Sequence, residues 1–317
     1  GLSDATPGQA ALKHSHPEWI AGLWWEALGA DGARALMAAD NEPGEVAIRA
    51  NTLVTDADSL ARELPVSTRR DPEIPEALVL QEPYDAHRSP LWEAGAFQPQ
   101  SRAAMLVARV LAPRPGERVL DLCAAPGGKS THLAALMGDR GEVVAVERDR
   151  RRAGVLVRSA QRLRARSVRV EVADAERERE EGAVFDRVLL DAPCSGLGTL
   201  QAHPDLRWRM TPAAVDRMAA AQARILAAAA GSLRPGGVLV YSTCTISPTE
   251  NERLIAAFLD SHPDFGIEDL AAEHPGYGLA RARAPGRQPA AESPPFLLTL
   301  PNRDHTAGFF IARLRRS

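Results

Sequence analysis

Cysteine is scarce in this chain, and its copies are isolated from one another. The sequence contains three, Cys123, Cys194 and Cys244, and none belongs to a Cys-x-x-Cys pair. Disulfide-stapled domains and structural zinc sites need several cysteines at close spacing, so the pattern argues against both and predicts no metal site. Isolated free thiols are typical of a reducing compartment, and we expect the protein to act in the cytoplasm.

The chain also lacks an apolar run of membrane-spanning length. Its most apolar helical stretch, Ala219–Ala230, is interrupted by Gln222 and Arg224, whereas a membrane span needs about 20 apolar residues. With 45% apolar and 25% charged residues, the composition is that of an ordinary globular protein. The length of 317 residues suffices for one large α/β domain and a smaller companion, and we expect a monomer with no membrane partner.

Lysine is nearly absent, occurring only at Lys13 and Lys129, so arginine supplies almost all the positive charge. The net charge of −3 hides a local asymmetry, because Arg148–Arg169 holds nine arginines and one acid, Asp149. Two interpretations stay open for this segment: a solvated helix face balanced by the acidic run Asp174–Glu181, or a patch that binds phosphate.

The pattern after Gly95 predicts an α/β fold. Strand-like runs alternate with helical ones, as in right-handed βαβ units around a parallel sheet. The predicted strands are Glu117–Cys123, Glu142–Glu147, Val168–Val172, Arg187–Leu190 and Gly237–Ser242, and the predicted helices are Ser130–Met137, Arg151–Arg164 and Ala213–Ser232. After a predicted loop over His274–Pro294, the strands Phe296–Leu300 and Gly308–Leu314 complete a Rossmann-like, seven-stranded, mostly parallel sheet with an antiparallel member.

The amino-terminal part predicts a separate unit. Residues 1–15 have the composition of a polar tail, and His16–Ala39 has helical periodicity. A strand over Glu45–Thr52 and a short helix over Asp56–Leu64 precede a Pro-rich, acidic segment that ends near Pro90. We therefore expect a tail (1–15), a small α+β domain (16–90) and a catalytic domain (91–317).

The segment Val119–Ser130, VLDLCAAPGGKS, combines a strand, a tight turn of small residues and a helix start. Such a turn binds ligands at the carboxyl end of a parallel sheet, and the helix start favours an anionic group. A phosphate-binding P-loop would need glycine where Cys123 stands, and no Gly-x-Gly-x-x-Gly is present. S-adenosylmethionine remains as the predicted cofactor, with Glu147 placed for its ribose and Asp174 for its adenine amine. The candidate cofactor-binding residues are Cys123, Ala124, Ala125, Pro126, Gly127, Gly128, Lys129, Glu147, Arg152, Asp174 and Asp191.

Two cysteines fall at the ends of the fourth and fifth predicted parallel strands, in Asp191–Gly196 (DAPCSG) and Tyr241–Thr245 (YSTCT). A thiolate that adds to carbon 6 of cytosine turns carbon 5 into a nucleophile for the methyl group, and it is later expelled. Asp191 could hold a proton at the ring nitrogen during the addition. Cys123, inside the first turn, fits a packing role.

These motifs resemble the RsmB/NOP/SUN family of RNA 5-methylcytosine methyltransferases. The resemblance extends over nearly the whole chain: HPEW (16–19), RANT (49–52), CAAPGGKS (123–130), DAPCSG (191–196), HPDLRW (203–208), and STCT (242–245) with the following Glu250–Glu252. It implies a class I S-adenosylmethionine methyltransferase domain preceded by a small RNA-binding domain. It further implies that Cys244 is the nucleophile, that Cys194 assists product release, and that Lys129 and Asp191 lie in the cofactor and target-base pocket.

Within that family, the HSHPEW start most resembles the bacterial enzymes of small-subunit ribosomal RNA, although no counterpart of their NusB-like domain stands upstream in this sequence. The expected partner is therefore RNA, either 16S rRNA or a partly assembled small ribosomal subunit, with the same chemistry on tRNA or another RNA as an alternative. Arg207 and Trp208 combine charge with an aromatic face suited to RNA, or else form a helix start packed on the sheet. Arg49, Asn51 and Gln100 are candidate RNA contacts through the resemblance alone.

Three other functions remain possible from the residues: a methyltransferase acting on DNA or protein, a nucleotide hydrolase using Gly128–Ser130, and a non-catalytic RNA-binding assembly factor.

Overall fold

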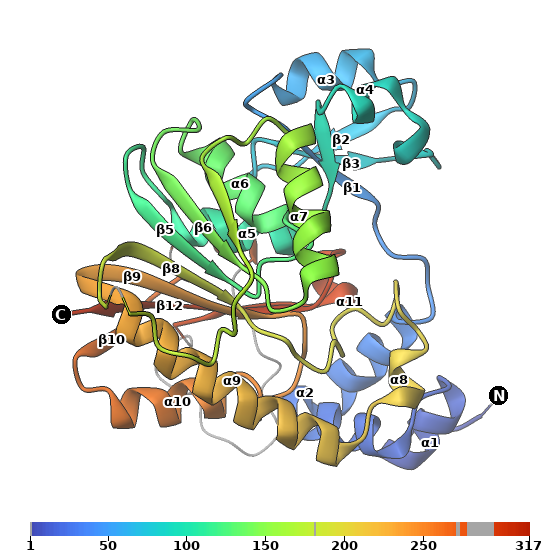
Figure 1. The fold of residues 1–317 in the computed structure, drawn as a ribbon. Coiled ribbons are helices and arrows are strands. Elements are labelled where there is room, and N and C mark those ends of the chain that lie inside the picture. Colours follow the sequence, from blue (N-terminus) through green and yellow to red (C-terminus); the bar gives the residue numbers. More distant parts are fainter. Residues whose placement is uncertain (1, 181, 271–272, 278–294) are drawn as a thin grey trace.

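The fold contains two sheets, a large one and a small one (Figure 1). Hydrogen bonds from the buried Arg49 of the small sheet to Gly128 and Thr131 join them. The computed structural model describes residues 2–180, 182–270, 273–277 and 295–317. The predicted loop His274–Pro294 lies mostly outside these residues, and of it only the turn η2 (Pro275–Tyr277) is an element of the fold.

The large sheet has the strand order β10-β12-β9-β8-β5-β6-β7, and β11 pairs with β12 beside this path. The strands from β7 to β9 in this order run parallel, whereas β12 is antiparallel to β9, β10 and β11. This confirms the predicted Rossmann-like, mostly parallel sheet, but the sheet has eight strands instead of the predicted seven, because β10 was not predicted. The bounds are β5 (Arg118–Leu122), β6 (Glu142–Val146), β7 (Val168–Glu171), β8 (Phe185–Asp191), β9 (Leu233–Thr243), β10 (Phe265–Glu268), β11 (Leu297–Thr299) and β12 (Phe309–Arg316).

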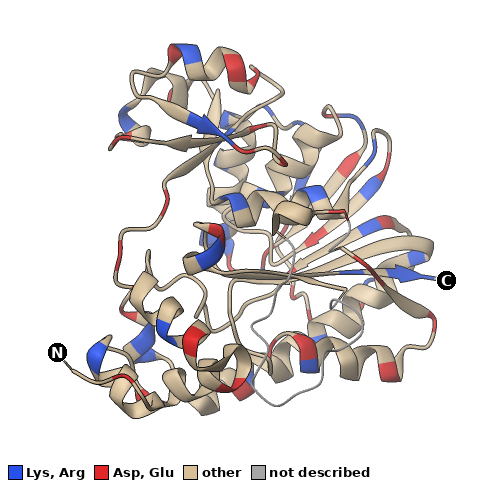
Figure 2. Ribbon diagram, turned by 180° about the vertical axis from the view of Figure 1, so that it is seen from behind, with Lys and Arg blue, Asp and Glu red and all other residues tan. Residues whose placement is uncertain are grey.

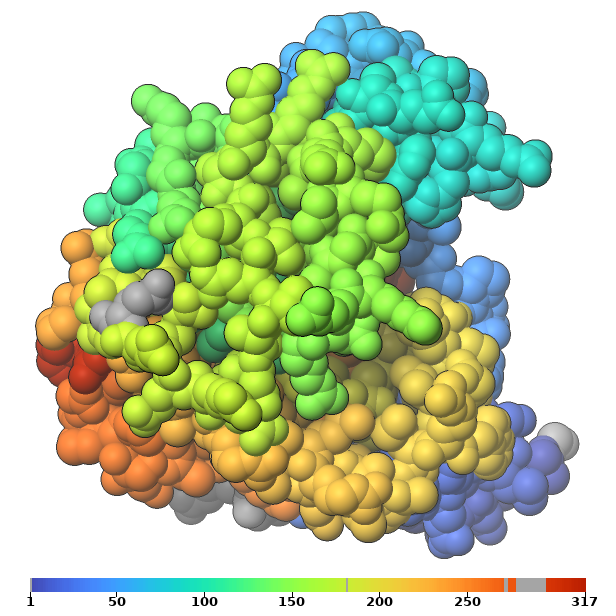
Figure 3. All heavy atoms as spheres, viewed as in Figure 1, coloured from blue at the N-terminus to red at the C-terminus, as the bar shows by residue number. Residues whose placement is uncertain are grey.

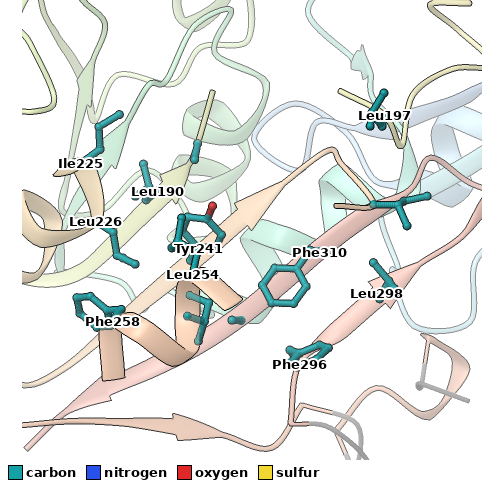
Figure 4. Close-up of a cluster of buried hydrophobic side chains, with 14 of the residues drawn as sticks. Leu190, Leu197, Ile225, Leu226, Tyr241, Leu254, Phe258, Phe296, Leu298 and Phe310 are labelled. Carbon is teal, nitrogen blue, oxygen red and sulfur yellow. The ribbon is translucent and has the colours of Figure 1, made fainter. Parts of the chain in front are cut away.

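Helices cover both faces of the large sheet. One face packs on α5, α6 and α7, and the other on α2 (Glu18–Ala39), α9 and α10. Figure 4 shows the second face, where Tyr241 of β9 lies among Phe310, Leu254 and Leu190, with the Tyr241 and Phe310 rings edge to face and their centroids 6.3 Å apart. The helices are α5 (Arg102–Leu111), α6 (Gly128–Leu136), α7 (Arg150–Arg162), α8 (Leu206–Arg209), α9 (Pro212–Ser232), α10 (Glu252–Ser261) and α11 (Pro301–Asp304).

The small sheet has the order β2-β3-β1-β4, with every pair antiparallel. Its last strand, β4, follows residue 90, so the small sheet extends past the predicted domain boundary. Its core is formed by apolar residues of β1, β3 and α3, with Phe97 fully buried. The elements are β1 (Ala47–Ala50), α3 (Ala57–Glu63), β2 (Thr68–Arg70), β3 (Ala77–Leu80), η1 (Ala86–Arg88), α4 (Pro90–Glu93) and β4 (Phe97–Pro99).

The amino-terminal segment differs most from the prediction. Residues expected to form a tail contain a helix, α1 (Pro7–Lys13), which Thr6 caps and which packs through Ala10 and Ala11 against α2 (Glu18–Ala39). The prediction of a tail was therefore wrong for this segment, because two buried alanines suffice to dock so short a helix. Helix α2 bends at Gly29 (φ 77°) and buries Trp24 in the core of the large domain rather than in the small one. Among the described residues, no helix has the length and apolar character needed to cross a membrane.

Candidate active site

The ends of four neighbouring strands meet at one edge of the large sheet. β5 pairs with both β6 and β8, and β8 pairs with β9 so that Asp191 lies beside Ser242. Because these strands are parallel, the residues that follow them gather at the same edge, which is where ligands bind in such sheets. The motifs CAAPGGKS, DAPCSG and STCT lie at the carboxyl ends of β5, β8 and β9, whereas HPDLRW does not lie at a strand end.

The turn after β5 is built for close approach to a ligand. Cys123 (φ 62°) and Gly127 (φ 104°) both take left-handed backbone conformations, and a Cβ at Gly127 would lie 3.1 Å from Leu156. Helix α6 begins at Gly128, so its first backbone N–H groups face the turn. Burial raises the pKa of the Cys123 thiol to about 12, which fits packing and not nucleophilic chemistry.

A cavity of about 230 Å³ opens beside this turn. The Glu147 carboxylate at the end of β6 is buried in its wall, where Oε1 accepts a hydrogen bond from the Asp149 N–H at 2.9 Å and Oε2 lies 3.4 Å from Arg152. Arg152 also donates to the Ala125 carbonyl at 2.9 Å, which ties the turn to the strand end. The cavity is lined by residues 123, 125, 146–148, 152, 173–176, 191–194, 225 and 244.

This donor set fits S-adenosylmethionine. Two carboxylates, Glu147 and the exposed Asp174, line the cavity and can accept hydrogen bonds from ribose hydroxyls and an adenine amine. The amino end of α6 offers N–H groups to a carboxylate. In the space-filling view the segments after β6 and β7 lie in the middle of one face, above α8 and α9 (Figure 3).

The two strand-end cysteines are in contact. The Sγ atoms of Cys194 and Cys244 lie 3.4 Å apart, and Cys244 also lines the cavity. The hydrogen bond with the Cys194 thiol lowers the pKa of Cys244, burial and the Asp191 carboxylate oppose this, and the Lys129 cation adds to the lowering. The same contact, together with burial, raises the pKa of Cys194 well above its usual value. The pair therefore favours a thiolate at Cys244 and a thiol at Cys194.

Lys129 and Asp191 complete this part of the site. Lys129 Nζ lies 2.7 Å from Asp191 Oδ2, while Ser242 Oγ donates to Asp191 Oδ1 at 2.8 Å. Burial by itself would lower the pKa of Lys129, but the Asp191 carboxylate outweighs it and the pKa is raised, so Lys129 stays a cation. Sequence reasoning missed Ser242, although its place two residues before Cys244 on a predicted strand was a signal.

Sequence reasoning also missed Asp121 at the core of the first motif. Its side chain is fully buried and accepts a hydrogen bond of 2.6 Å from Ser130 Oγ. Burial raises the pKa of Asp121 to about 7. A second cavity of about 210 Å³ lies on this side of the turn, with Gln100, Lys129 and Asp191 in its wall.

Three of the predicted RNA contacts are instead buried structural residues. Arg49 (0% exposed) donates to the Gly128 carbonyl at 2.6 Å and to Gln100 Oε1 at 2.9 Å, and Asn51 (1%) donates to the carbonyls of Gly95 and Leu163. Arg207 (4%) donates to Asn41 Oδ1 and to the carbonyls of Ser15 and Asp40. The prediction that these three side chains contact RNA was wrong, because their donors are used to join segments of the fold. Trp208, by contrast, is 63% exposed.

A doubly wound sheet with this turn, a buried acid at the next strand end and a cavity between them defines a Rossmann-like methyltransferase that uses S-adenosylmethionine. The chain belongs to the family described as 16S rRNA methyltransferase RsmB/F, whose model matches residues 108–315. A second model, the ferredoxin-like domain of RsmF/B-like methyltransferases, matches residues 16–87.

Relatives and solved structures agree with this assignment. The chain is similar to a probable ribosomal RNA small subunit methyltransferase B of Synechocystis sp., with 38% identity over 96% of this chain and 68% of the relative. The protein of the same description from Bacillus subtilis is 34% identical over 96% of this chain and 67% of the relative, so the chain spans about two-thirds of the length of these relatives. Among solved structures, PH0851 is similar with a TM-score of 0.86 and 32% identity, and the match covers 100% of this chain and 70% of that chain. A methyltransferase homologue from Pyrococcus horikoshii is similar with a TM-score of 0.81 and 27% identity, and the match covers 99% of this chain and 100% of that chain.

Proposed function

We propose that this protein transfers a methyl group to carbon 5 of a cytosine in RNA, with small-subunit ribosomal RNA as the substrate. The observation that carries the proposal is the contact between Cys194 and Cys244, 3.4 Å apart, at the edge of the cofactor cavity. Methylation at an amine or a hydroxyl needs no cysteine nucleophile. Carbon 5 of cytosine needs one, because the ring must first be made electron-rich.

Each cysteine has a distinct role in the proposed reaction. The Cys244 thiolate adds to carbon 6 of the cytosine, and the electron pair released into the ring makes carbon 5 nucleophilic. S-adenosylmethionine, when bound, supplies the electrophilic methyl group. After the proton on carbon 5 has left to a base, the bond between sulfur and carbon 6 breaks. The Cys194 thiol then donates a hydrogen bond to the departing sulfur, from which it lies only 3.4 Å away in the free protein.

Lys129 and Asp191 prepare the site for this addition. The Lys129 cation lowers the pKa of Cys244 and holds one oxygen of Asp191, while Ser242 holds the other. This fixed carboxylate is placed to hold a proton at the ring nitrogen of the target base as negative charge develops there.

Several features support RNA as the substrate. The relatives in Synechocystis and Bacillus subtilis are described as small-subunit rRNA methyltransferases. The exposed Trp208 offers a stacking face. Exposed arginines also lie in α7 and in the segments directly before and after it: Arg148, Arg150, Arg151, Arg158, Arg164 and Arg166. Basic and acidic residues are interspersed over both domains, so these arginines form only a local basic segment (Figure 2). The small domain would then hold the RNA while the target base leaves its stack.

A labelling experiment tests the proposal. Wild type, Cys244→Ala and Cys194→Ala are incubated with methyl-labelled S-adenosylmethionine and either unmodified 16S rRNA or partly assembled small subunits, and the nucleosides are analysed. We expect 5-methylcytosine from wild type, none from Cys244→Ala, and a covalent protein–RNA adduct from Cys194→Ala. Equal labelling by wild type and Cys244→Ala would refute the covalent mechanism, and label on another base or on tRNA alone would refute the assigned product or substrate.

A further inference from the structure

A cluster of buried polar side chains lies directly behind the two cysteines. Its members are Ser195, Gln222, Thr245, Glu250 and Asn251, each at most 1% exposed. Burying a carboxylate and two amides at one place is unfavourable unless their hydrogen bonds are made. Burial indeed raises the pKa of Glu250, against the effect of its hydrogen bonds from Ser195 and Gln222. The hydrogen bonds of this cluster converge on the residues that flank Cys194 and Cys244.

Glu250 holds the loop that carries Cys194. Its Oε1 accepts hydrogen bonds from the backbone N–H of Ser195 at 2.8 Å and from Gln222 Nε2 at 3.0 Å, and its Oε2 accepts one from Ser195 Oγ at 2.5 Å. Gln222 also donates to the Pro193 carbonyl at 2.9 Å. The residues on both sides of Cys194 are thus fixed by one carboxylate and its amide partner.

Asn251, the next residue, holds the segment that carries Cys244. Its Oδ1 accepts a hydrogen bond from Thr243 Oγ1 at 2.6 Å, and its Nδ2 donates to the Thr245 carbonyl at 2.9 Å. The side chain therefore bridges the residues on both sides of Cys244.

The two held segments are also joined to each other. Ser195 Oγ and Thr245 Oγ1, one residue after each cysteine, lie 2.7 Å apart, and the Gly198 N–H donates to the Cys244 carbonyl at 2.9 Å. The distance between the two sulfur atoms is set by this frame, because a thiol contact is too weak to position two loops by itself.

We propose that Glu250 and Asn251 are positioning residues with separate tasks, Glu250 placing Cys194 for product release and Asn251 placing Cys244 for attack on the base. This proposal rests on the proposed function for the two chemical steps, attack on the base and product release. The hydrogen bonds described above assign one of the two residues to each step. Neither residue lines the cofactor cavity, so neither is expected to touch cofactor or base.

Near-isosteric variants separate the two tasks. In Glu250→Gln, the side chain loses the negative charge that strengthens its hydrogen bonds from Ser195 and Gln222, so the Cys194 loop is held less firmly. In Asn251→Asp, a carboxylate oxygen faces the Thr245 carbonyl and repels it. Arg253→Gln is the matched control, since Arg253 is exposed on the next turn and pairs only loosely with Glu26 at 3.4 Å. If Glu250→Gln fails to fold, Ser195→Ala is used in its place. If Asn251→Asp fails to fold, Thr243→Val is used in its place.

Each variant is followed by three measurements on the full chain: the formation and decay of the covalent RNA adduct on denaturing gels, the alkylation rate of each cysteine by iodoacetamide, and thermal unfolding. A displacement of about 1 Å in a reacting group lowers a rate by up to about a hundredfold, so we expect effects of about tenfold or more. Asn251→Asp should slow adduct formation and Cys244 alkylation while adduct decay stays within about twofold of wild type. Glu250→Gln should form the adduct but slow its decay about tenfold, so that the adduct accumulates.

The outcomes separate this proposal from the proposed function. The assignment of Glu250 and Asn251 would be overturned if their variants matched Arg253→Gln in all rates. It would also be overturned if each variant slowed adduct formation and decay equally, in proportion to its loss of thermal stability. In both cases a covalent adduct in wild type would still support the proposed function. If wild type forms no adduct and Cys244→Ala still methylates, the proposed function fails. In that case the alkylation rates alone test whether these residues position the cysteines. Selective slowing of Cys244 alkylation in Asn251→Asp would support the positioning role, and unchanged alkylation rates would overturn it.

Discussion

Lys129 Nζ and Asp191 Oδ2 lie 2.7 Å apart, although one residue lies in the first turn of α6 and the other ends β8. Ser242 of β9 holds the second oxygen of the same carboxylate. Three strand ends are thereby joined through one acid, and the ring of Phe309 lies 5.1 Å from the ammonium group. The positive charge is kept close to the thiol whose pKa it helps to lower.

Replacing this lysine should weaken the nucleophile. In Lys129→Met the Cys244 thiolate loses a neighbouring cation, so its pKa rises and the pH dependence of its alkylation moves to higher pH. Methyl transfer should fall by about a hundredfold, the range typical of a positioned charged group in an active site. The control is Lys13→Met, at the other lysine, which lies at the end of α1 and pairs with Asp4. An unchanged alkylation profile would show that Lys129 does not act on Cys244.

Glu147 should determine much of the affinity for the cofactor. The Glu147→Gln variant keeps the shape of the buried side chain but offers one acceptor oxygen instead of two. We expect S-adenosylmethionine to bind about tenfold more weakly, as for the loss of one charge-assisted hydrogen bond. Isothermal titration calorimetry measures this directly. Glu171→Gln, at the end of the neighbouring strand β7 but outside the cavity wall, should bind as wild type does.

The catalytic sheet was predictable because its signals are local. Each parallel strand is a short apolar run followed at once by its functional residue, so Glu147, Asp191 and Cys244 could be assigned to one edge before any contact was known. The roles of Arg49, Asn51 and Arg207 could not be predicted in this way. Their partners lie 44 to 192 residues away in sequence, and a side chain that bridges segments has the same local pattern as one that binds RNA.

Trp208 should contribute to RNA binding through its exposed ring. A base stacked on an aromatic side chain contributes about 1–3 kcal/mol, so Trp208→Ala should weaken RNA binding by at least about fivefold without lowering stability. Stacking depends less on salt than phosphate contacts do, so the loss should persist at high ionic strength. Filter binding at two salt concentrations tests this, with Leu12→Ala as a control, because Leu12 is also exposed, at 71%. Equal affinity of the two variants would place the RNA elsewhere.

The buried pair of Glu76 and His132 should make the stability of the protein pH-dependent. Glu76 stands just before β3 of the small sheet, and its Oε1 lies 2.6 Å from His132 Nε2 on α6 and 2.9 Å from Arg109 Nε on α5. Burial and the nearby Arg49 lower the pKa of His132 to about 4, so a neutral imidazole donates to the carboxylate. His132 and Arg109 hold the pKa of Glu76 below its usual range despite burial.

Both shifts act in the same direction. Between about pH 6.5 and pH 4 the unfolded chain takes up a proton at His132 and the folded chain does not, so acidification through this window favours unfolding by up to about 3 kcal/mol. When the pH falls below the ordinary pKa of a glutamate, the unfolded chain also takes up a proton at Glu76 while the folded chain does not, which lowers the stability further. His132→Gln can keep a donor to Glu76 but removes the titration, so its stability in urea should fall less between about pH 7 and pH 4.5 than that of wild type. His203→Gln, at an exposed histidine, should follow wild type. Parallel pH profiles for wild type and His132→Gln would mean that the pKa of His132 is the same in the folded and unfolded chains, which would refute the lowered pKa.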